Sequence, residues 1–385
     1  MNKKRALLVD TNFSARPIYD YLINAGLEVY VIGANPNDSL AKTVNNYIEL
    51  NYAKINELED VIKKLKIDLL VPGGNDFSYK ICAEIASKKN FYNIDTPYQY
   101  EVINNKEKFR KFSLELGLHV PQKLQVDNVA DSLPVIIKPA DAYSGHGITV
   151  LHTYTKEKLE LSINKAKKYS KTDSFLIEEF IEGQLYSHSA FVVNGELMID
   201  FIVEEHCTVN PYVVNTSRVI NNFENSILES IRSDIMRLSK ALDLPDGLIH
   251  TQFIMNENDF WLIEVTRRCP GDLYSKLIEY STGFPYAEFY ARPFINQVEE
   301  YKLNNLNASK VIRHTITSEE PIDFHSLTYY DAFDKQIFYP LSLTGDKLRE
   351  SPFSRIALLF GFSNDIEQHN RLWKKFLTHN FYQIN

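Results

Sequence analysis

A carboxylate and two adjacent arginines interrupt an apolar run in the segment "WLIEVTRRCPGD", residues 261–272. If this segment is a strand, its two-residue period places Glu264, Thr266 and Arg268 on one face and Arg267 on the other. A carboxylate and a guanidinium four residues apart can form a structural ion pair. They can equally be a metal ligand beside an arginine that binds a carboxylate or phosphate through two hydrogen bonds. The residues alone leave both interpretations open.

The preceding residues, together with this strand, have the pattern of a β-hairpin, "HTQFIMNENDFWLIEV". With a three-residue loop at 257–259, Gln252 lies opposite Glu264 on the same face, whereas a loop of two or four residues turns the two side chains to opposite faces. Two neighbouring oxygen ligands suit Mg²⁺, which also keeps waters and substrate phosphates. The metal hypothesis therefore requires the odd-length loop.

A loop of small residues, "KPADAYSGHG", follows another apolar run. Ser144, Gly145 and Gly147 would allow backbone N–H groups to approach an anion closely, and Lys138 leads into the same loop. The chain contains no G-x-x-x-x-G-K-[ST] phosphate-binding motif. A glycine-containing turn beside an unrelated lysine explains the same residues.

Two carboxylates lie in the apolar segment "FLIEEFIEG", residues 175–183. Alternation places Glu178 and Phe180 on one face and Glu179 and Ile181 on the other. Backbone groups at 179–181 could hydrogen-bond the edge of a purine while a carboxylate binds its exocyclic amine. An edge strand with one solvated face is the competing interpretation.

The elements that position these residues fall into βα units. Residues 5–95 alternate short apolar runs with helical segments, which predicts a doubly wound parallel sheet. No G-x-G-x-x-G follows the first strand, so a dinucleotide site is not expected there. "VPGGND" (71–76) either places a ligand at the carboxyl end of its strand or is a plain turn. A second αβ unit follows, with an Asn-Gly hairpin turn at 194–195, and the last ~95 residues predict a smaller unit that is either mixed α/β or rich in β-strands.

Composition narrows the class of protein. The 385 residues carry 42 Lys and Arg against 50 Asp and Glu, a formal charge of −8, which argues against a nucleic-acid partner. No apolar run is long enough to predict a membrane span. Three cysteines stand far apart and outside any C-x-x-C pair, so neither a disulfide framework nor a zinc site is expected. We expect a reduced, cytoplasmic protein.

The order of these motifs resembles the ATP-grasp superfamily of the carboxylate–amine ligase type, similar to amino-acid ligases and carbamoyl-phosphate-synthase-like proteins. A lysine-led helix, an apolar strand ending in lysine, the small-residue loop, the "EEFIEG" strand, a hairpin and an E-x-x-x-R strand before "PGD" carry the resemblance. It is most specific over 134–272. The resemblance implies an α/β fold with a Rossmann-like pre-ATP-grasp domain at 1–95, a two-subdomain ATP-grasp domain at 96–290 with a flexible small subdomain at about 125–185, and a lid-like C-terminal α/β domain at 291–385.

For the nucleotide, the resemblance implies an ATP site made of several segments. Lys106 and Lys138 resemble the lysines that hold the phosphates. Residues 144–147, with Ser144, Gly145 and Gly147, resemble the loop that closes over them, and 178–181 resemble the adenine-binding segment. The family often has a ribose-binding carboxylate where this chain has Leu185.

For the metal and the chemistry, the resemblance implies that Glu264 bridges two Mg²⁺ ions and that Arg268 holds an acyl phosphate. Gln252 and Thr266 stand where the family has a carboxylate and an asparagine. Both keep an oxygen ligand, but one negative charge is lost, which lowers the expected affinity for divalent cations. Either one metal site is weaker or another acid, such as Asp272, compensates.

The resulting hypothesis is an enzyme, an ADP-forming ligase that activates a small carboxylate as an acyl phosphate and joins it to an amine. Arg218 or Arg267 would bind a substrate carboxylate, although an inter-domain ion pair competes as an explanation for Arg267. His206 and His250 are interpreted as packed or solvated side chains. Bicarbonate activation, a kinase-like ATP-grasp activity and a degenerate nucleotide-binding module remain as alternatives, and a homodimer is implied by the resemblance alone.

Overall fold

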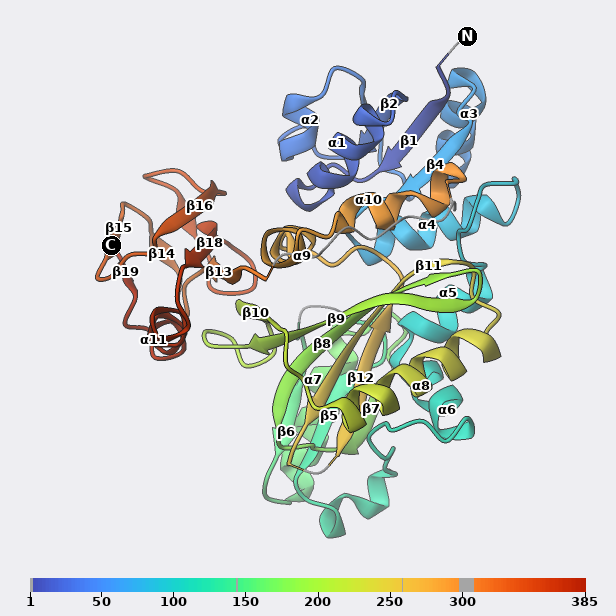
Figure 1. Cartoon of the computed structure of the whole chain (residues 1–385). Helices are drawn as coiled ribbons and strands as arrows, with labels where there is room; N and C mark the ends of the chain where they lie inside the picture. Colours follow the sequence, from blue (N-terminus) through green and yellow to red (C-terminus); the bar gives the residue numbers. More distant parts are fainter. Residues whose placement is uncertain (1–2, 143–144, 258, 298–307) are drawn as a thin grey trace.

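The computed structural model describes residues 3–142, 145–257, 259–297 and 308–385. The N-terminal domain, the central sheets and the C-terminal part succeed one another along the chain, with the C-terminal part to one side of the central sheets (Figure 1). No helix in these described ranges combines the length and apolar composition that crossing a bilayer requires.

The N-terminal domain is a four-stranded parallel sheet in the order β3-β2-β1-β4. Its elements are β1 (Arg5–Val9), α1 (Arg16–Asn24), β2 (Glu28–Gly33), α2 (Ser39–Thr43), β3 (Tyr47–Glu49), α3 (Ile55–Leu65), β4 (Leu69–Pro72) and α4 (Asp76–Ala86). β1 and β4 are apolar and almost fully buried, as expected for strands covered on both faces. The predicted doubly wound parallel sheet is confirmed, and its carboxyl edge faces the rest of the chain.

Two helices connect this domain to a small three-stranded sheet. α5 (Pro97–Asn104) starts with a capping box at Thr96, and α6 (Lys106–Glu115) is capped by Asn105, whose side chain accepts from two backbone N–H groups of the first turn. The small sheet has the order β6-β5-β7. Its elements are β5 (Val135–Pro139), β6 (Thr149–Leu151), α7 (Lys156–Tyr169) and β7 (Phe175–Glu179). These elements lie inside the range expected for the small subdomain, whose boundaries remain a prediction.

The large sheet has eight strands in the order β12-β11-β8-β9-β10-β13-β18-β16. Its strands are β8 (Gln184–Val193), β9 (Glu196–His206), β10 (Thr216–Ile220), β11 (Gly247–Met255), β12 (Phe260–Thr266), β13 (Lys310–Ile316), β16 (Lys335–Pro340) and β18 (Ala357–Ser363). The predicted Asn-Gly turn joins β8 to β9, with both turn residues at positive φ. The predicted C-terminal unit is not a separate layer, because β13, β16 and β18 hydrogen-bond into this same sheet.

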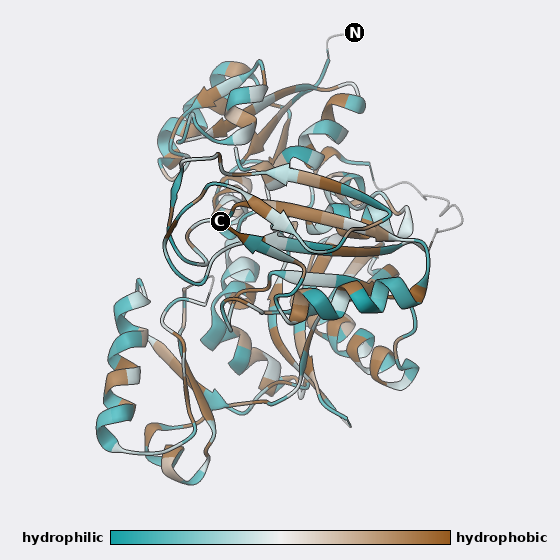
Figure 2. Ribbon diagram, turned by 90° about the vertical axis from the view of Figure 1, so that its left-hand side faces the viewer, coloured by the Kyte–Doolittle hydropathy of each residue, from teal (hydrophilic) through white to brown (hydrophobic). Residues whose placement is uncertain are grey.

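Helices cover the two faces of the large sheet differently. α8 (Asn225–Ala241) packs its apolar stripe on one face, in a core with β11 and β12. α9 (Tyr274–Thr282) and α10 (Tyr286–Ala291) lie between the other face and the N-terminal domain (Figure 1). Figure 2 shows the hydrophobic strands inside and hydrophilic residues along the outer sides of the helices.

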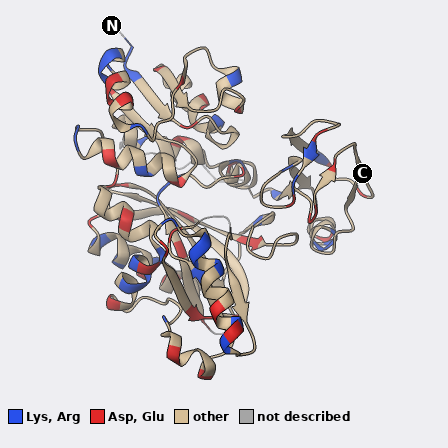
Figure 3. Ribbon diagram, turned by 180° about the vertical axis from the view of Figure 1, so that it is seen from behind, with Lys and Arg blue, Asp and Glu red and all other residues tan. Residues whose placement is uncertain are grey.

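The C-terminal part completes this arrangement. α11 (Ile366–Leu377) packs against β13 and β18 through Leu372, Trp373 and Phe376. Short strand pairs close the unit: β14 (Ile322–Asp323) with β17 (Lys347–Leu348), and β15 (Leu327–Tyr329) with β19 (Tyr382–Ile384). Figure 3 shows acidic and basic residues interspersed along the helices of all three parts.

Candidate active site

Charged side chains from the central part and the C-terminal part of the chain meet in one pocket of about 210 Å³ beside the α9 face of the large sheet. The strand pattern places Glu264, Thr266 and Arg268 on this face, as expected from their spacing. The other polar lining residues come from β9, β11, β13, the turn after β12 and the segment before β18: Glu205, His250, Gln252, Asp272, Arg313 and Arg355. The pocket therefore combines carboxylate and amide oxygens with three guanidinium groups.

The hairpin of β11 and β12 places Gln252 directly opposite Glu264. Of the loop lengths left open, the structure has four residues, 256–259, and not the odd length that the metal hypothesis required. A bulge between Gln252 and Phe253 restores the register by adding one residue to β12. The extra residue shifts the alternation of side chains along β12 by one position. Glu264 therefore faces the pocket while Leu262, two residues earlier, stays in the core under α8.

Arg110 of α6 donates hydrogen bonds to two backbone carbonyl groups at this bulge. Its Nη1 donates to the Leu262 carbonyl at 3.0 Å and its Nη2 to the Ile263 carbonyl at 3.5 Å. The Arg110 side chain is 1% exposed, and its Nε pairs with Glu178 of β7. Sequence reasoning missed Arg110, because its place on an otherwise ordinary helix carries no motif. Arg110 ties the small sheet to the strand that carries Glu264.

Glu178 is a buried link between two cations. One carboxylate oxygen binds Arg110 and the other binds the Lys138 ammonium. Burial alone would raise the pKa of Glu178, but Lys138 and Arg110 hold it below its usual value. Binding of a purine amine by the Glu178 side chain would have to displace one of these cations. The structure therefore favours the backbone, and not this carboxylate, for contact with a base.

The backbone at 179–181 is partly used by the protein itself. The Glu179 N–H donates to the Gln122 carbonyl and the Phe180 N–H donates to the Pro134 carbonyl. Within the described ranges the Ile181 N–H has no such acceptor. Of the three amides proposed to read a base, the one at Ile181 remains available.

The glycine loop lies next to Lys106. Lys106 is the first residue of α6, and its Nζ donates to the Ala142 carbonyl at 2.9 Å. Gly145 and Gly147 have φ of 70° and 75°, values that favour glycine. A Cβ at Gly145 would lie 2.4 Å from Cβ of Tyr212, so the loop and the turn after β9 approach each other closely. Ser144 lies outside the described residues.

Arg268 is held by the N-terminal domain. Its Nε and Nη2 donate to the two oxygens of Asp76 at 2.9 and 3.0 Å. Asp76 is the first residue of α4 and the last residue of "VPGGND", so that segment does reach the site. Thr266 Oγ1 also donates to Asp76, at 3.3 Å, and accepts from the Arg268 N–H. The Thr266 hydroxyl is thus engaged with Asp76, which disfavours its expected use as a metal ligand.

The metal hypothesis rests on Gln252 and Glu264. Within the described residues, the Glu264 carboxylate forms no hydrogen bond or ion pair, and no group of three or more His, Cys, Asp or Glu is arranged to hold a metal ion. Gln252 Nε2 donates to Glu205 at 2.7 Å. The remaining donor set, an amide oxygen and a carboxylate, fits Mg²⁺ only together with phosphates and water. Asp272, the acid that could compensate for Gln252, lines the same pocket, and its carboxylate lies 3.4 Å from Arg355.

The expected substrate arginine, Arg218, lies on the opposite face of the sheet. Its Nε pairs with Glu204 at 2.8 Å, and its guanidinium stacks over Trp373. The neighbouring residue Ser217 faces the pocket side instead, where it accepts a hydrogen bond from Arg313 Nε at 2.8 Å. Arg218 therefore does not line this pocket, whereas Arg313, which sequence reasoning missed, does.

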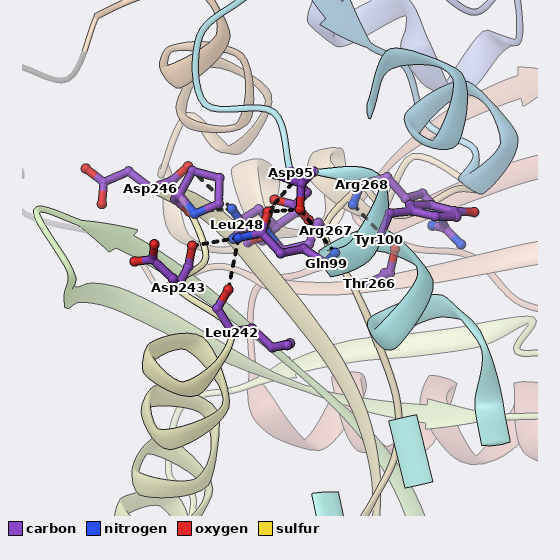
Figure 4. Close-up of polar contacts among 12 residues, drawn as sticks. Asp95, Gln99, Tyr100, Leu242, Asp243, Asp246, Leu248, Thr266, Arg267 and Arg268 are labelled. Carbon is purple, nitrogen blue, oxygen red and sulfur yellow. Dashed lines mark hydrogen bonds and ion pairs between the residues drawn. The ribbon is translucent and has the colours of Figure 1, made fainter. Parts of the chain in front are cut away.

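Arg267 has a structural position. Its Nε donates to Asp95 at 3.1 Å and its Nη1 to the Leu248 carbonyl at 2.6 Å, and the side chain is 2% exposed. Figure 4 shows Arg267 among Asp95 and Leu248, whereas Arg268 lies apart beside Thr266. The interpretation of Arg267 as an inter-domain ion pair agrees with these contacts.

His250 and Cys269, which lie near the pocket, are both uncharged at neutral pH. His250 Nδ1 lies 2.8 Å from Ser189 Oγ, and burial lowers its pKa well below the usual value, so the ring is neutral at pH 7. Burial raises the pKa of Cys269 to about 12, although Arg268 opposes it. A reactive thiolate at Cys269 is therefore excluded at neutral pH.

A second cavity of about 620 Å³ adjoins this pocket at the carboxyl edge of the N-terminal sheet. Arg268, Gly271, Asp272 and Arg355 line both. The far wall carries carboxylate, amide and hydroxyl side chains: Asp10, Thr11, Asn12, Ser14, Asn35, Asp38, Asn51, Tyr52 and Asn75. Beyond the two shared arginines, its lining contains no Lys or Arg from the described ranges.

Comparisons with known proteins match this geometry. Residues 131–276 match the family model of the ATP-grasp domain. The chain is 28% identical over 310 residues to the carbamoyl phosphate synthase large chain of Methanosphaerula palustris, a match that covers 73% of this chain and 28% of that protein. The chain spans about a quarter of the length of the curated relatives it matches.

Solved structures show the same fold along the chain. The L-amino acid ligase from Bacillus licheniformis superposes with a TM-score of 0.83 at 14% identity, over 100% of this chain and 99% of that one. Phosphoribosylglycinamide synthetase from Anaerococcus prevotii superposes with a TM-score of 0.74 at 18% identity, over 100% of both chains. Residues 131–276 thus resemble an ATP-grasp domain in sequence, and the chain has the same fold as these two solved proteins.

Proposed function

We propose that the protein is an ATP-dependent, ADP-forming ligase that activates a carboxylate as an acyl phosphate and joins it to an amine. The observation that carries this proposal is the meeting of the Gln252–Glu264 oxygen pair with Arg268 in one pocket. The oxygens suit a cation that binds phosphate, and the guanidinium suits the anion made by phosphoryl transfer.

ATP and Mg²⁺ are the implied cofactors. Gln252 and Glu264 would hold the cation, which neutralises phosphate charge during transfer. Lys106 and Lys138 would hold the phosphates, the loop through Gly145 would cover them, and the free N–H of Ile181 would bind the base. The small sheet with Lys138 and the large sheet with Glu264 are linked by Arg110, which keeps the two halves of this nucleotide site in register.

The chemistry needs positioning more than a strong base. A substrate carboxylate oxygen attacks the terminal phosphorus of ATP, the bond to ADP breaks, and an acyl phosphate forms. Arg268 and Arg313 stabilise the anion, since both guanidinium groups face the pocket. An amine then attacks the acyl carbon, and phosphate leaves.

The two adjoining cavities have room for two small-molecule substrates. We assign the reacting groups to the pocket beside Glu264 and the body of one substrate to the cavity above Arg268 and Arg355. The far wall of that cavity offers carboxylates and amides, which suit hydroxyl or ammonium groups better than a phosphate.

A second candidate is the release of a small acyl phosphate without an amine step. The relation to large chains of carbamoyl phosphate synthase favours it, because the product in that name is itself an acyl phosphate.

The proposed location is the cytoplasm, since Cys82, Cys207 and Cys269 are free thiols that persist in a reducing compartment. A homodimer stays an expectation from the family resemblance.

The test is ADP release from ATP and Mg²⁺ over a panel of amino acids and other small carboxylates, each with and without a panel of amines. ADP that requires both a carboxylate and an amine supports the ligase. ADP with a phosphorylated product and no amine supports the second candidate. No ADP with any pair, together with no binding of ATP, overturns both.

A further inference from the structure

Glu205 is a buried carboxylate that points at the metal-binding face and forms no ion pair with a described residue. It lies on β9 and is 3% exposed. Its Oε1 accepts from the Ser187 hydroxyl at 2.9 Å and its Oε2 accepts from Gln252 Nε2 at 2.7 Å. Burial of this carboxylate is costly and raises its pKa, an effect that the charge of Arg313 opposes.

The contact with Gln252 fixes how that amide is oriented. The amide presents its N–H group to Oε2 of Glu205 at 2.7 Å, because two unprotonated oxygens at this distance would repel. An amide has its nitrogen and oxygen on opposite sides, so Oε1 of Gln252 is turned away from Glu205. Glu264 is the cross-strand partner of Gln252 on the same face.

Gln252 stands where the family resemblance implies a carboxylate ligand, and Glu205 accepts a hydrogen bond from its side-chain amide. We propose that Glu205 orients Gln252 and returns the missing negative charge to the metal site without touching the metal itself. The proposal rests on the proposed use of ATP and Mg²⁺. Hydrogen bonds from an outer carboxylate to a metal ligand commonly affect metal affinity by about 10- to 100-fold.

The neighbouring residue Glu204 provides a matched control. It lies next to Glu205 on β9 but faces the other side of the sheet, where it pairs with Arg218 at 2.8 Å and His206 at 2.9 Å. Both residues are glutamates on the same strand, and only Glu205 contacts Gln252.

The experiment is a titration of Mn²⁺ into the full chain with saturating ADP, followed by the loss of the free Mn²⁺ signal in electron paramagnetic resonance. Glu205→Gln should weaken Mn²⁺ binding by about 10- to 100-fold, whereas Glu204→Gln should bind as the wild type does. The exchange variant Q252E/E205Q moves the charge onto the ligand itself and should restore binding. Thermal unfolding of each variant checks that it is folded.

Two results would overturn the inference. In the first, Glu205→Gln binds Mn²⁺ like the wild type; if that variant also lost ligase activity, Glu205 would be a proton acceptor for the amine. In the second, the exchange variant binds no better than Glu205→Gln. Wild-type protein that binds no Mn²⁺ with ADP would instead overturn the proposed function, and this inference with it.

Discussion

Arg268 and Asp76 form a two-point ion pair across 192 residues of sequence, with distances of 2.9 and 3.0 Å. The pair joins the strand that carries Glu264 to the first turn of α4 in the N-terminal domain. Arg268 is also the proposed anion-binding group. The contact with Asp76 therefore links the position of the N-terminal domain to the position of the group that binds the anion.

Replacing Asp76 by Asn should lower the free energy of unfolding by about 1.5–3 kcal/mol, the value of a hydrogen-bonded charge. Burial alone would raise the pKa of Asp76, but Arg268 lowers it overall. A lowered carboxyl pKa stabilises the fold above the unfolded value of about 4 and loses that effect as pH falls through the folded value. Urea unfolding at pH 7 and at pH 3 checks this. An equal difference between wild type and Asp76→Asn at both pH values would contradict it.

Both arginine variants should lose stability, since each leaves a carboxylate, Asp95 or Asp76, without its partner, but only the loss of Arg268 should impair activity in the folded protein. Arg267→Met should cost about 3–5 kcal/mol of unfolding free energy, because Asp95 is left buried without its partner. The folded fraction should keep its nucleotide affinity. Arg268→Met should lower kcat/KM by about 10- to 150-fold, equivalent to 1.5–3 kcal/mol of transition-state stabilisation. If Arg267→Met abolished nucleotide binding in folded protein, the division of roles would be wrong.

Arg313→Met should reduce kcat/KM by a similar factor of about 10 to 150. Arg218→Met removes an equal charge from the opposite face of the sheet and should leave kcat/KM close to that of the wild type. Steady-state ADP release for the two variants decides the point. A larger loss in Arg218→Met than in Arg313→Met would restore the assignment made from the sequence.

Removal of Lys138 and removal of Arg110, the two cations paired with Glu178, should have different effects on stability. Lys138→Met leaves Glu178 paired with Arg110, so the free energy of unfolding should change little. The affinity for nucleotide should fall at least about tenfold. Arg110→Met also frees the bulge carbonyls of Leu262 and Ile263, so it should cost about 3–5 kcal/mol. Calorimetric titration with ATP and urea unfolding measure the two effects. Equal stability losses in both variants would contradict the arrangement.

The sequence predicts local features well, because local physics produces them. Strand period alone separated Glu264 and Arg268 from Arg267, and the Asn-Gly turn located the hairpin of β8 and β9. Period also shows that Arg218 and Ser217 face opposite ways, but not which face is functional. That choice depends on α9 and on β13, which follow later in the chain.

Features made by tertiary packing could not be predicted. The bulge at Gln252 and Phe253 has no turn motif, since it arises where Leu262 must stay in the core while Glu264 faces the pocket. Asp76 and Arg313 reach the site from other parts of the chain. Glu205 carries no motif in the sequence, because only the folded sheet brings it within hydrogen-bond distance of Gln252.

The central claim is that one pocket joins a carboxylate to an amine at the expense of ATP. The most direct measurement is ADP release by the wild type and by Arg268→Met, with carboxylate alone, amine alone and both together. ADP release by the wild type should require both substrates, and it should fall about 10- to 150-fold in Arg268→Met. Release that does not depend on any carboxylate, or that is unchanged in Arg268→Met, would contradict it.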